Sequence, residues 1–292
     1  MSGQPETVIV AGQRQDQAID TVVSQFINGH AATNRKTGQY MRDDVRPVCP
    51  ETVGMPPAFD AFVTARVPSV AKSVGARTDV SGKCIPNVEI LFTDQPQTLV
   101  KALAEKTRGA ILGMHFLHET PRLMEVTHPV QGWYVTGTRY DDAQISPVST
   151  VDREGNAGPT DNQKPKIDSA YRNGPERIVT GSLIPARRVS SIVNVLIVAD
   201  INKLGGHEIG PVSDYISMLA LSEPRSLDEC NEFPSIIDLY SSGCNGRGTP
   251  TTLTASDIAY LKGLYAADLG ATTVSAQKNS IATGMKSNMD NR

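Results

Sequence analysis

The stretch Leu253-Thr254-Ala255-Ser256-Asp257-Ile258 belongs to the part of the sequence that decides the fold. Thr254 and Asp257 stand three residues apart at the start of a helical pattern, which is the arrangement of a capping box. They predict a helix that continues through Tyr265. Upstream, the chain reads Phe233-Pro234-Ser235-Ile236-Ile237, which predicts a turn.

A second helix is expected before this turn, over residues 211–222, after the glycine turn at 205–206. Pro211 would occupy its first helical position, where proline is common. One face should pack into the core and is formed by Val212, Tyr215, Ile216 and Leu219. The other face, expected to line a cleft, is formed by Ser213, Asp214 and Ser217.

This order of helix, turn and helix resembles the downstream part of a zincin metallopeptidase domain. In zincins a metal-binding helix with the signature HExxH precedes a PSIM-like turn under the metal and then an LTxxDI…LY helix. The resemblance extends from Ser191 to Tyr265 and implies a zincin-like α+β fold, a mixed sheet with packed helices. The upstream order of helices and strands is compatible with the upper half of such a domain in topology.

The metal ligands of that signature are replaced in this chain. Zinc needs two histidines four residues apart on one helical face, with a glutamate beside the first. Aligned on the downstream landmarks, these degenerate metal-site positions are Ser213, Asp214 and Ser217. Because neutral hydroxyls are poor zinc ligands, no metal and no other cofactor is expected. Asp214 remains a candidate acid or base, although a carboxylate at a helix start also interacts favourably with the helix dipole.

The remaining histidines do not complete a metal signature. His207 and Glu208 begin an HExxH-like frame, but Gly210 and Pro211 follow, so the pair lies in a turn without a second histidine. Three further histidines lie close together in sequence without HExxH or HxxEH order, and we expect them to face solvent or bond locally. They are His115, His118 and His128. No GxSxG elbow and no phosphate-binding glycine spacing is present.

Composition excludes two classes of protein. The 292 residues are 39% hydrophobic and 20% charged, which is ordinary for a globular chain with a full core. The net charge of −3, without long blocks of like sign, is not that of a nucleic-acid binder. No run of 18 apolar residues occurs, so no transmembrane segment is expected.

The four cysteines favour export. Local pairing would join Cys49 to Cys84 and Cys230 to Cys244, the second bond closing a loop of about 15 residues. Disulfides of this kind occur in oxidising compartments, so we expect a periplasmic or secreted protein. The start of the chain at Met1 is not a signal peptide, and the native precursor is expected to carry one. Four reduced, buried thiols are the alternative.

Periodicity divides the chain into an N-terminal appendage, 1–40, and an α+β domain, 41–292, with a polar insertion at about 141–176. The appendage should hold a short strand, Thr7 to Ala11, and an amphipathic helix, Gln17 to Ala31. In the domain, helices are expected at 57–75 and 98–106, and strands at 87–93, 132–140 and 191–200. The apolar face of the first of these helices should include Phe59, Phe62, Val63, Val67, Val70, Ala71 and Val74.

Two further resemblances concern cellular context. Residues Thr7 to Arg14 (TVIVAGQR) are similar to the leader near the start of TonB-dependent receptors. The pattern Cys-x-Pro-Asn-Val-x-x-x-Phe-Thr, from Cys84 to Thr93, resembles one that recurs in uncharacterised exported proteins of alphaproteobacteria.

These observations predict a non-catalytic exported protein with a degenerate metallopeptidase-like scaffold and a binding or accessory role. Its partner would be a protein or a cell-envelope ligand. One alternative is an atypical hydrolase in which Asp214 works with His207 and Glu208 in the cleft. Another is a structural accessory of an outer-membrane assembly, which the leader at Thr7 to Arg14 favours.

Overall fold

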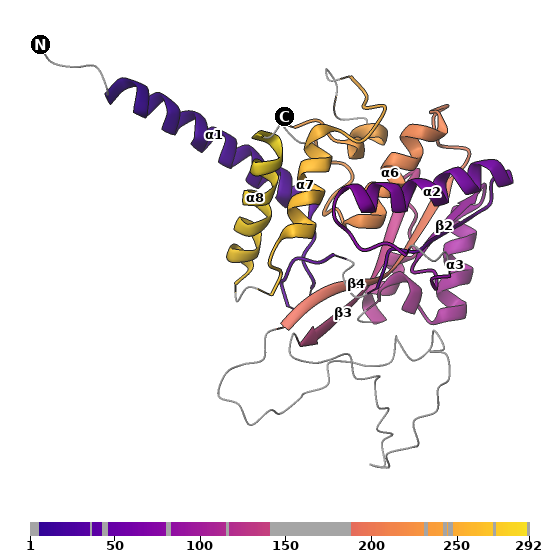
Figure 1. Ribbon diagram of the computed structural model, residues 1–292. Helices are drawn as coiled ribbons and strands as arrows, with labels where there is room; N and C mark the ends of the chain where they lie inside the picture. Colours follow the sequence, from indigo (N-terminus) through magenta and orange to yellow (C-terminus); the bar gives the residue numbers. More distant parts are fainter. Residues whose placement is uncertain are drawn as a thin grey trace, which may run out of the picture.

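The computed structural model describes residues 6–35, 37–42, 46–79, 83–114, 117–140, 188–230, 233–241, 244, 248–270 and 273–290. It shows an α+β architecture in which helices pack on a mixed four-stranded sheet (Figure 1). The strands are β1 (Pro50–Val53), β2 (Val88–Thr93), β3 (Val130–Tyr140) and β4 (Arg188–Asp200). Their spatial order is β1-β2-β4-β3; β1, β2 and β4 run parallel, and β3 pairs antiparallel with β4.

Both faces of the sheet are covered, as the apolar run of β4 requires. Alternate residues of this strand point to opposite sides: Val195 and Ile197 join one hydrophobic cluster, and Leu196 and Val198 join the other. The first cluster includes residues of α2 (Pro57–Ser73) and α6 (Ile209–Leu221). The second is closed by α3 (Pro96–Thr107) and the 3₁₀ turn η1 (Ala110–Leu112). Two short turns, η2 (Leu117–Glu119) and α4 (Thr120–Leu123), precede β3.

A group of three helices packs beside this layer. They are α1 (Glu6–His30), α7 (Ala255–Ala266) and α8 (Val274–Asp290) (Figure 1). Helices α7 and α8 meet at two glycines: a Cβ on Gly263 would lie 2.6 Å from the carbonyl oxygen of Ile281. Phe26 and Ile27, in the second half of α1, are buried in the same cluster as the sheet residues.

Several expected elements are confirmed and others need correction. The buried strand at 191–200, the strands at 87–93 and 132–140, and the helices at 57–75 and 98–106 are present with small shifts of their ends. The expected strand at Thr7–Ala11 is wrong, because these residues belong to the continuous helix α1. The polar insertion at about 141–176 lies outside the described residues. No helix among those described is both long and apolar enough to cross a membrane.

Two helices differ in detail from expectation. Phe59 and Phe62 do not pack into the core; they are 42% and 46% exposed on the outer side of α2, because the sheet contacts only the Val63, Val67 and Val70 side of the helix. Helix α6 begins at Ile209, so Pro211 is its third residue rather than its first.

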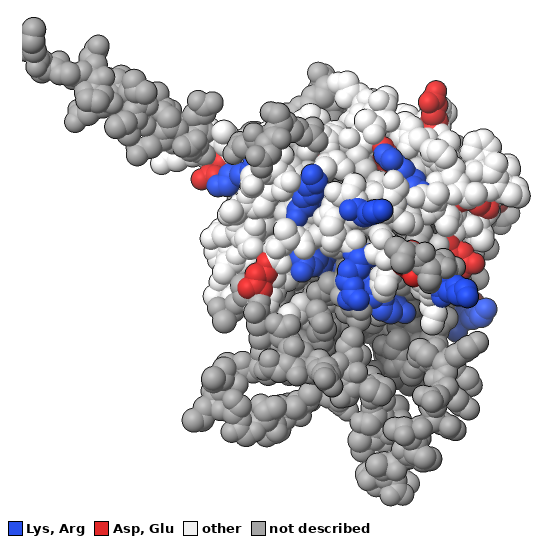
Figure 2. All heavy atoms as spheres, viewed as in Figure 1, with Lys and Arg blue, Asp and Glu red and all other residues white. Residues whose placement is uncertain are grey.

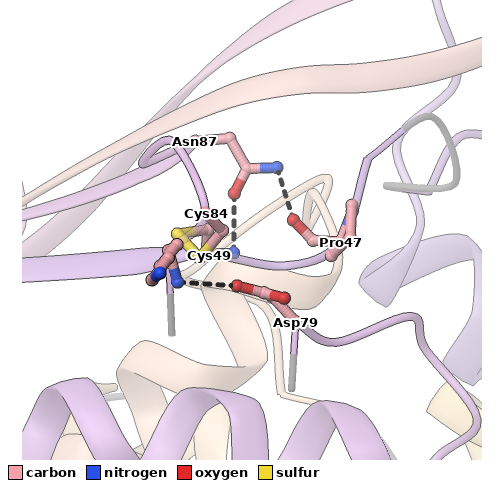
Figure 3. Close-up of a disulfide and its surroundings, with 6 residues drawn as sticks. Pro47, Cys49, Asp79, Cys84 and Asn87 are labelled. Atoms are coloured by element: carbon pink, nitrogen blue, oxygen red, sulfur yellow. Dashed lines mark hydrogen bonds between the residues drawn. A yellow bond between two sulfur atoms is a disulfide. The ribbon is translucent and has the colours of Figure 1, made fainter. Parts of the chain in front are cut away.

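Both expected disulfides are present, Cys49–Cys84 and Cys230–Cys244. The first lies just before β1 and is supported by Asn87 (Figure 3). The Asn87 side chain accepts a hydrogen bond from the Cys49 N–H at 2.8 Å and donates one to the Pro47 carbonyl at 3.2 Å. Cys84 and Asn87 therefore both attach the entry of β1 to the entry of β2.

Candidate binding site around Asp214

Helix α6 lies in the middle of the molecule. All ten residues from Val212 to Leu221 are buried, although Ser213, Asp214 and Ser217 among them are polar. Helix α2 packs on α6, and the 3₁₀ turn η3 (Ile236–Tyr240) packs on it as well. The polar side chains of α6 must therefore find partners within the protein.

Asp214 accepts three hydrogen bonds from two other segments of the chain. Its Oδ1 accepts a hydrogen bond from Nε of Arg66 on α2 at 2.5 Å. Its Oδ2 accepts one from Oγ1 of Thr252 at 2.7 Å and one from the N–H of Leu253 at 3.0 Å. Asp214 lies in the second turn of α6, so the expected interaction with the helix start is not its main role. The carboxylate joins α2, α6 and the segment before α7.

Ser213 and Ser217 are both completely buried. The Ser213 hydroxyl donates to the carbonyl of Ile209 at 2.6 Å, and the Ser217 hydroxyl donates to the carbonyl of Ser213 at 2.7 Å. Serines often bond back to the preceding helical turn in this way. The expectation that they line an open cleft is wrong, because α6 is packed on this side too. Bonded hydroxyls of this kind do not fit a zinc ion.

An open pocket of about 440 Å³ lies next to Asp214. Phe62 and Ala65 of α2 form its apolar part. Its polar part comes from Arg66 and Ser69 of α2, from Gly210 in the first turn of α6, and from Thr251 and Thr252. Of Ser213, Asp214 and Ser217, only Asp214 is among the lining residues.

His207 and Glu208 lie apart from this pocket's lining. The His207 ring packs edge-on against Tyr240 of η3, with 5.5 Å between ring centroids. Glu208 is exposed and precedes the first residue of α6 without a side-chain capping bond. The structure therefore gives these two residues surroundings different from those of Asp214.

The other histidines do not form a metal site in the described part of the chain. Nε2 of His128 lies 3.1 Å from Oδ1 of Asp228, and His118 is exposed. His115 lies outside the described residues. Among the residues that the structure describes, no group of three or more His, Cys, Asp and Glu side chains is arranged to hold a metal ion.

A buried polar network lies under the turn η3. Oγ of Ser235, the residue that caps η3, lies 2.8 Å from Nε2 of His30 and 2.6 Å from Oδ1 of Asp257. The other carboxylate oxygen of Asp257 accepts from the N–H of Ile236 and from Thr254. The predicted capping box of Thr254 and Asp257 is confirmed, and the same carboxylate also fastens the turn to α7.

This network holds one proton more than an ionised Asp257 and a neutral His30 would. Nδ1 of His30 lies 2.9 Å from the Phe26 carbonyl, which can only accept, so Nδ1 carries a proton. The Ser235 hydroxyl has one proton for two acceptors, so either His30 or Asp257 must bring another. Burial lowers the pKa of His30 to about 4 and raises that of Asp257, and both directions favour Asp257 over His30 as the carrier of this proton.

No family model, curated protein or solved structure matches the chain. Sequence reasoning identified Asp214 but missed both Arg66 and His30. Arg66 lies 148 residues before Asp214, and no local pattern reports such a contact. For His30, the available signal was its place at the end of an amphipathic helix, where an apolar neighbour such as Phe26 indicates burial.

Proposed function

We propose that this chain is a non-catalytic exported protein with a degenerate metallopeptidase-like scaffold, and that it acts by binding. The observation that carries the proposal is the state of the triplet Ser213, Asp214 and Ser217. The triplet keeps the spacing of a zincin signature, but both hydroxyls bond to their own helix and the carboxylate bonds to three donors. No acid, base or metal ligand in the triplet is left free for chemistry.

The arrangement around α6 supports the zincin-like part of the proposal. Turn η3 packs directly on α6, as a turn beneath a metal-binding helix would. Asp257 at the start of α7 bonds to Ser235 and to the Ile236 N–H. The PSIM-like turn and the LTxxDI-like helix start, on which the resemblance to zincins rests, therefore contact one another. Helix α6, turn η3 and helix α7, which follow one another in the sequence, thus also pack together in space.

The two disulfides support the exported location. Cross-links of this kind persist in the periplasm or outside the cell, where thiols are not kept reduced. A binding role in the cell envelope or outside it fits such a location.

The test is a combined search for metal and for peptide hydrolysis. Protein purified without chelator and without a histidine tag is examined by elemental analysis, and is then incubated with zinc and a mixture of peptides that is read by mass spectrometry. We expect no stoichiometric metal and no cleavage. Cleavage that is lost in both Asp214→Asn and His207→Ala would support the alternative hydrolase, in which Asp214, His207 and Glu208 cooperate, and would refute a purely binding role.

The scaffold itself is tested by restoring the histidine pair. In Ser213→His combined with Ser217→His, two larger side chains enter a packed region and should lower stability by about 1–3 kcal/mol each. Because histidines at i and i+4 hold zinc, added zinc should raise the melting temperature of this double variant but not that of the parent. A folded double variant whose melting temperature does not change with added zinc would contradict the zincin-like assignment.

A further inference from the structure

The pocket beside Asp214 has unused hydrogen-bond donors, and they indicate what it can bind. Its one carboxylate already has three donors, since Asp214 accepts from Arg66, Thr252 and Leu253. A ligand therefore gains little by donating hydrogen bonds to Asp214.

The donors on the same wall remain available. Arg66 is 37% exposed and gives only its Nε to Asp214; its two terminal amino groups make no hydrogen bond to any other described residue. The hydroxyls of Ser69 and Thr251 likewise have no partner within the described part of the chain. The N–H of Gly210 lies in the first turn of α6, where a helix supplies no acceptor.

The shape and polarity of the lining restrict the ligand further. A guanidinium with free terminal groups matches a planar carboxylate, which can accept two parallel hydrogen bonds. Phe62 and Ala65 provide an apolar surface next to these donors, and Phe62 is 46% exposed. A suitable ligand therefore carries a carboxylate directly beside an apolar group.

We propose that this pocket binds the C-terminal carboxylate of a peptide whose last side chain is apolar. The carboxylate would bond to Arg66 and to the donors of Ser69 and Gly210, and the last side chain would pack on Phe62. The inference rests on the proposed binding role and specifies its ligand. Figure 2 shows that Lys and Arg side chains are spread over the face crossed by α2, with acidic side chains among and around them.

The experiment is a titration of the ¹⁵N-labelled full chain, followed by amide chemical shifts. The ligand is acetyl-Gly-Gly-Phe with a free carboxylate, and the comparison ligand is the same peptide with a C-terminal amide. We expect the acid to shift the amides of Gly210, Thr251 and Thr252, and the amide form to bind at least about ten-fold more weakly, because it loses a charge-assisted pair. Inorganic phosphate is titrated as a third ligand.

Two matched variants locate the effect. Ala65→Glu places a negative charge in the pocket and should abolish binding of the acid. Ala58→Glu places the same charge on an exposed position of the same helix that does not line the pocket, and binding should stay within about two-fold of the parent. Both positions are exposed, so both variants should fold, which far-ultraviolet circular dichroism checks.

Equal binding of acid and amide, the same shifts with phosphate at similar affinity, or retained binding in Ala65→Glu would each overturn the inference. Absence of any shift, with no hydrolysis in the mass-spectrometry assay, would overturn this ligand assignment and leave the non-catalytic role intact. Cleavage of the peptides would instead refute the non-catalytic role.

Discussion

At the scale of single residues, Asp214 is the side chain whose role changes most when the structure is considered. A charge at a helix start would contribute at most about 1 kcal/mol. The observed carboxylate is buried and accepts three hydrogen bonds, so Asp214→Ala would leave a guanidinium, a hydroxyl and a backbone N–H without their acceptor. We expect a loss of about 3 kcal/mol in the free energy of unfolding, measured by urea denaturation.

The control is Asp20→Ala. Asp20 also pairs with a cation, Lys286, but its side chain is 58% exposed. A surface pair contributes about 0–1 kcal/mol, so this change should be small. Equal losses in the two variants would contradict the structural role assigned to Asp214.

Asp257 tests the protonation of the buried network. If Asp257 carries the additional proton, asparagine can replace it, because its amide group donates to Ser235 and its carbonyl still accepts from Ile236. Asp257→Asn should then cost less than about 1 kcal/mol, whereas Asp257→Ala, which leaves several buried donors unpaired, should cost about 3 kcal/mol or more. Thermal denaturation of both variants at pH 7 measures the difference; comparable losses would place the proton on His30.

Glu223 gives a pH dependence of defined sign. Burial raises its pKa to about 7, although the positive charge of Arg35 opposes the shift. The folded state therefore keeps a proton that the unfolded state releases at its usual pKa of about 4.3, and stability is lost as pH rises from there to 7. Glu223→Gln should equal the parent in stability at pH 4 and exceed it by about 3–4 kcal/mol at pH 8, since one pKa unit corresponds to about 1.4 kcal/mol. If the stabilities of the parent and of Glu223→Gln change in parallel between pH 4 and pH 8, the raised pKa of Glu223 is excluded.

At the scale of elements, the contact between α7 and α8 depends on the absence of side chains. A Cβ on Gly263 would lie 2.6 Å from the Ile281 carbonyl oxygen and 2.8 Å from the Met285 nitrogen, both backbone atoms. Gly263→Ala should therefore separate the helices and cost about 2–3 kcal/mol, although alanine is usually the better helix former. Gly210→Ala in α6 is the control, since a Cβ there meets nothing within 4 Å; it should not lower the melting temperature.

The elements that the sequence predicts correctly are those whose characteristic residues lie close together along the chain. Strand β4 contains the apolar run Val195 to Ala199, and the capping box of α7 is complete within four residues, so the sequence predicts both correctly. Strand β1 has only four residues, and α8 contributes to the core chiefly through Gln277, Ile281 and Met285, so neither gave a clear apolar pattern. Burial on α2 was misjudged because apolar residues occur around most of its circumference.

At the scale of the whole molecule, the site could be predicted only in part. Of the expected positions, only Asp214 lines the pocket. Its partners could not be predicted, because Arg66 comes from α2 and Thr252 from the segment before α7, and only the folded chain brings them together. The burial of Ser213 and Ser217 follows from the packing of α6 within the molecule, which no helical periodicity encodes.

The link between Cys49 and Cys84 has a consequence for how the chain reaches its native state. Pro50, directly after Cys49, pairs with Val88, and the two cysteine Cα atoms are 6.0 Å apart. A slip of one residue would move β1 by about 3.3 Å along β2, exchange its two faces and change the separation of the two cysteines, whereas a disulfide tolerates only a narrow range of Cα distances. Formation of the Cys49–Cys84 bond is therefore favoured in chains in which β1 already pairs with β2 in the native register. In chains with other disulfides, thiol exchange can break the incorrect bond and allow the strand to pair again. In an oxidising compartment, this bond selects correctly assembled sheets.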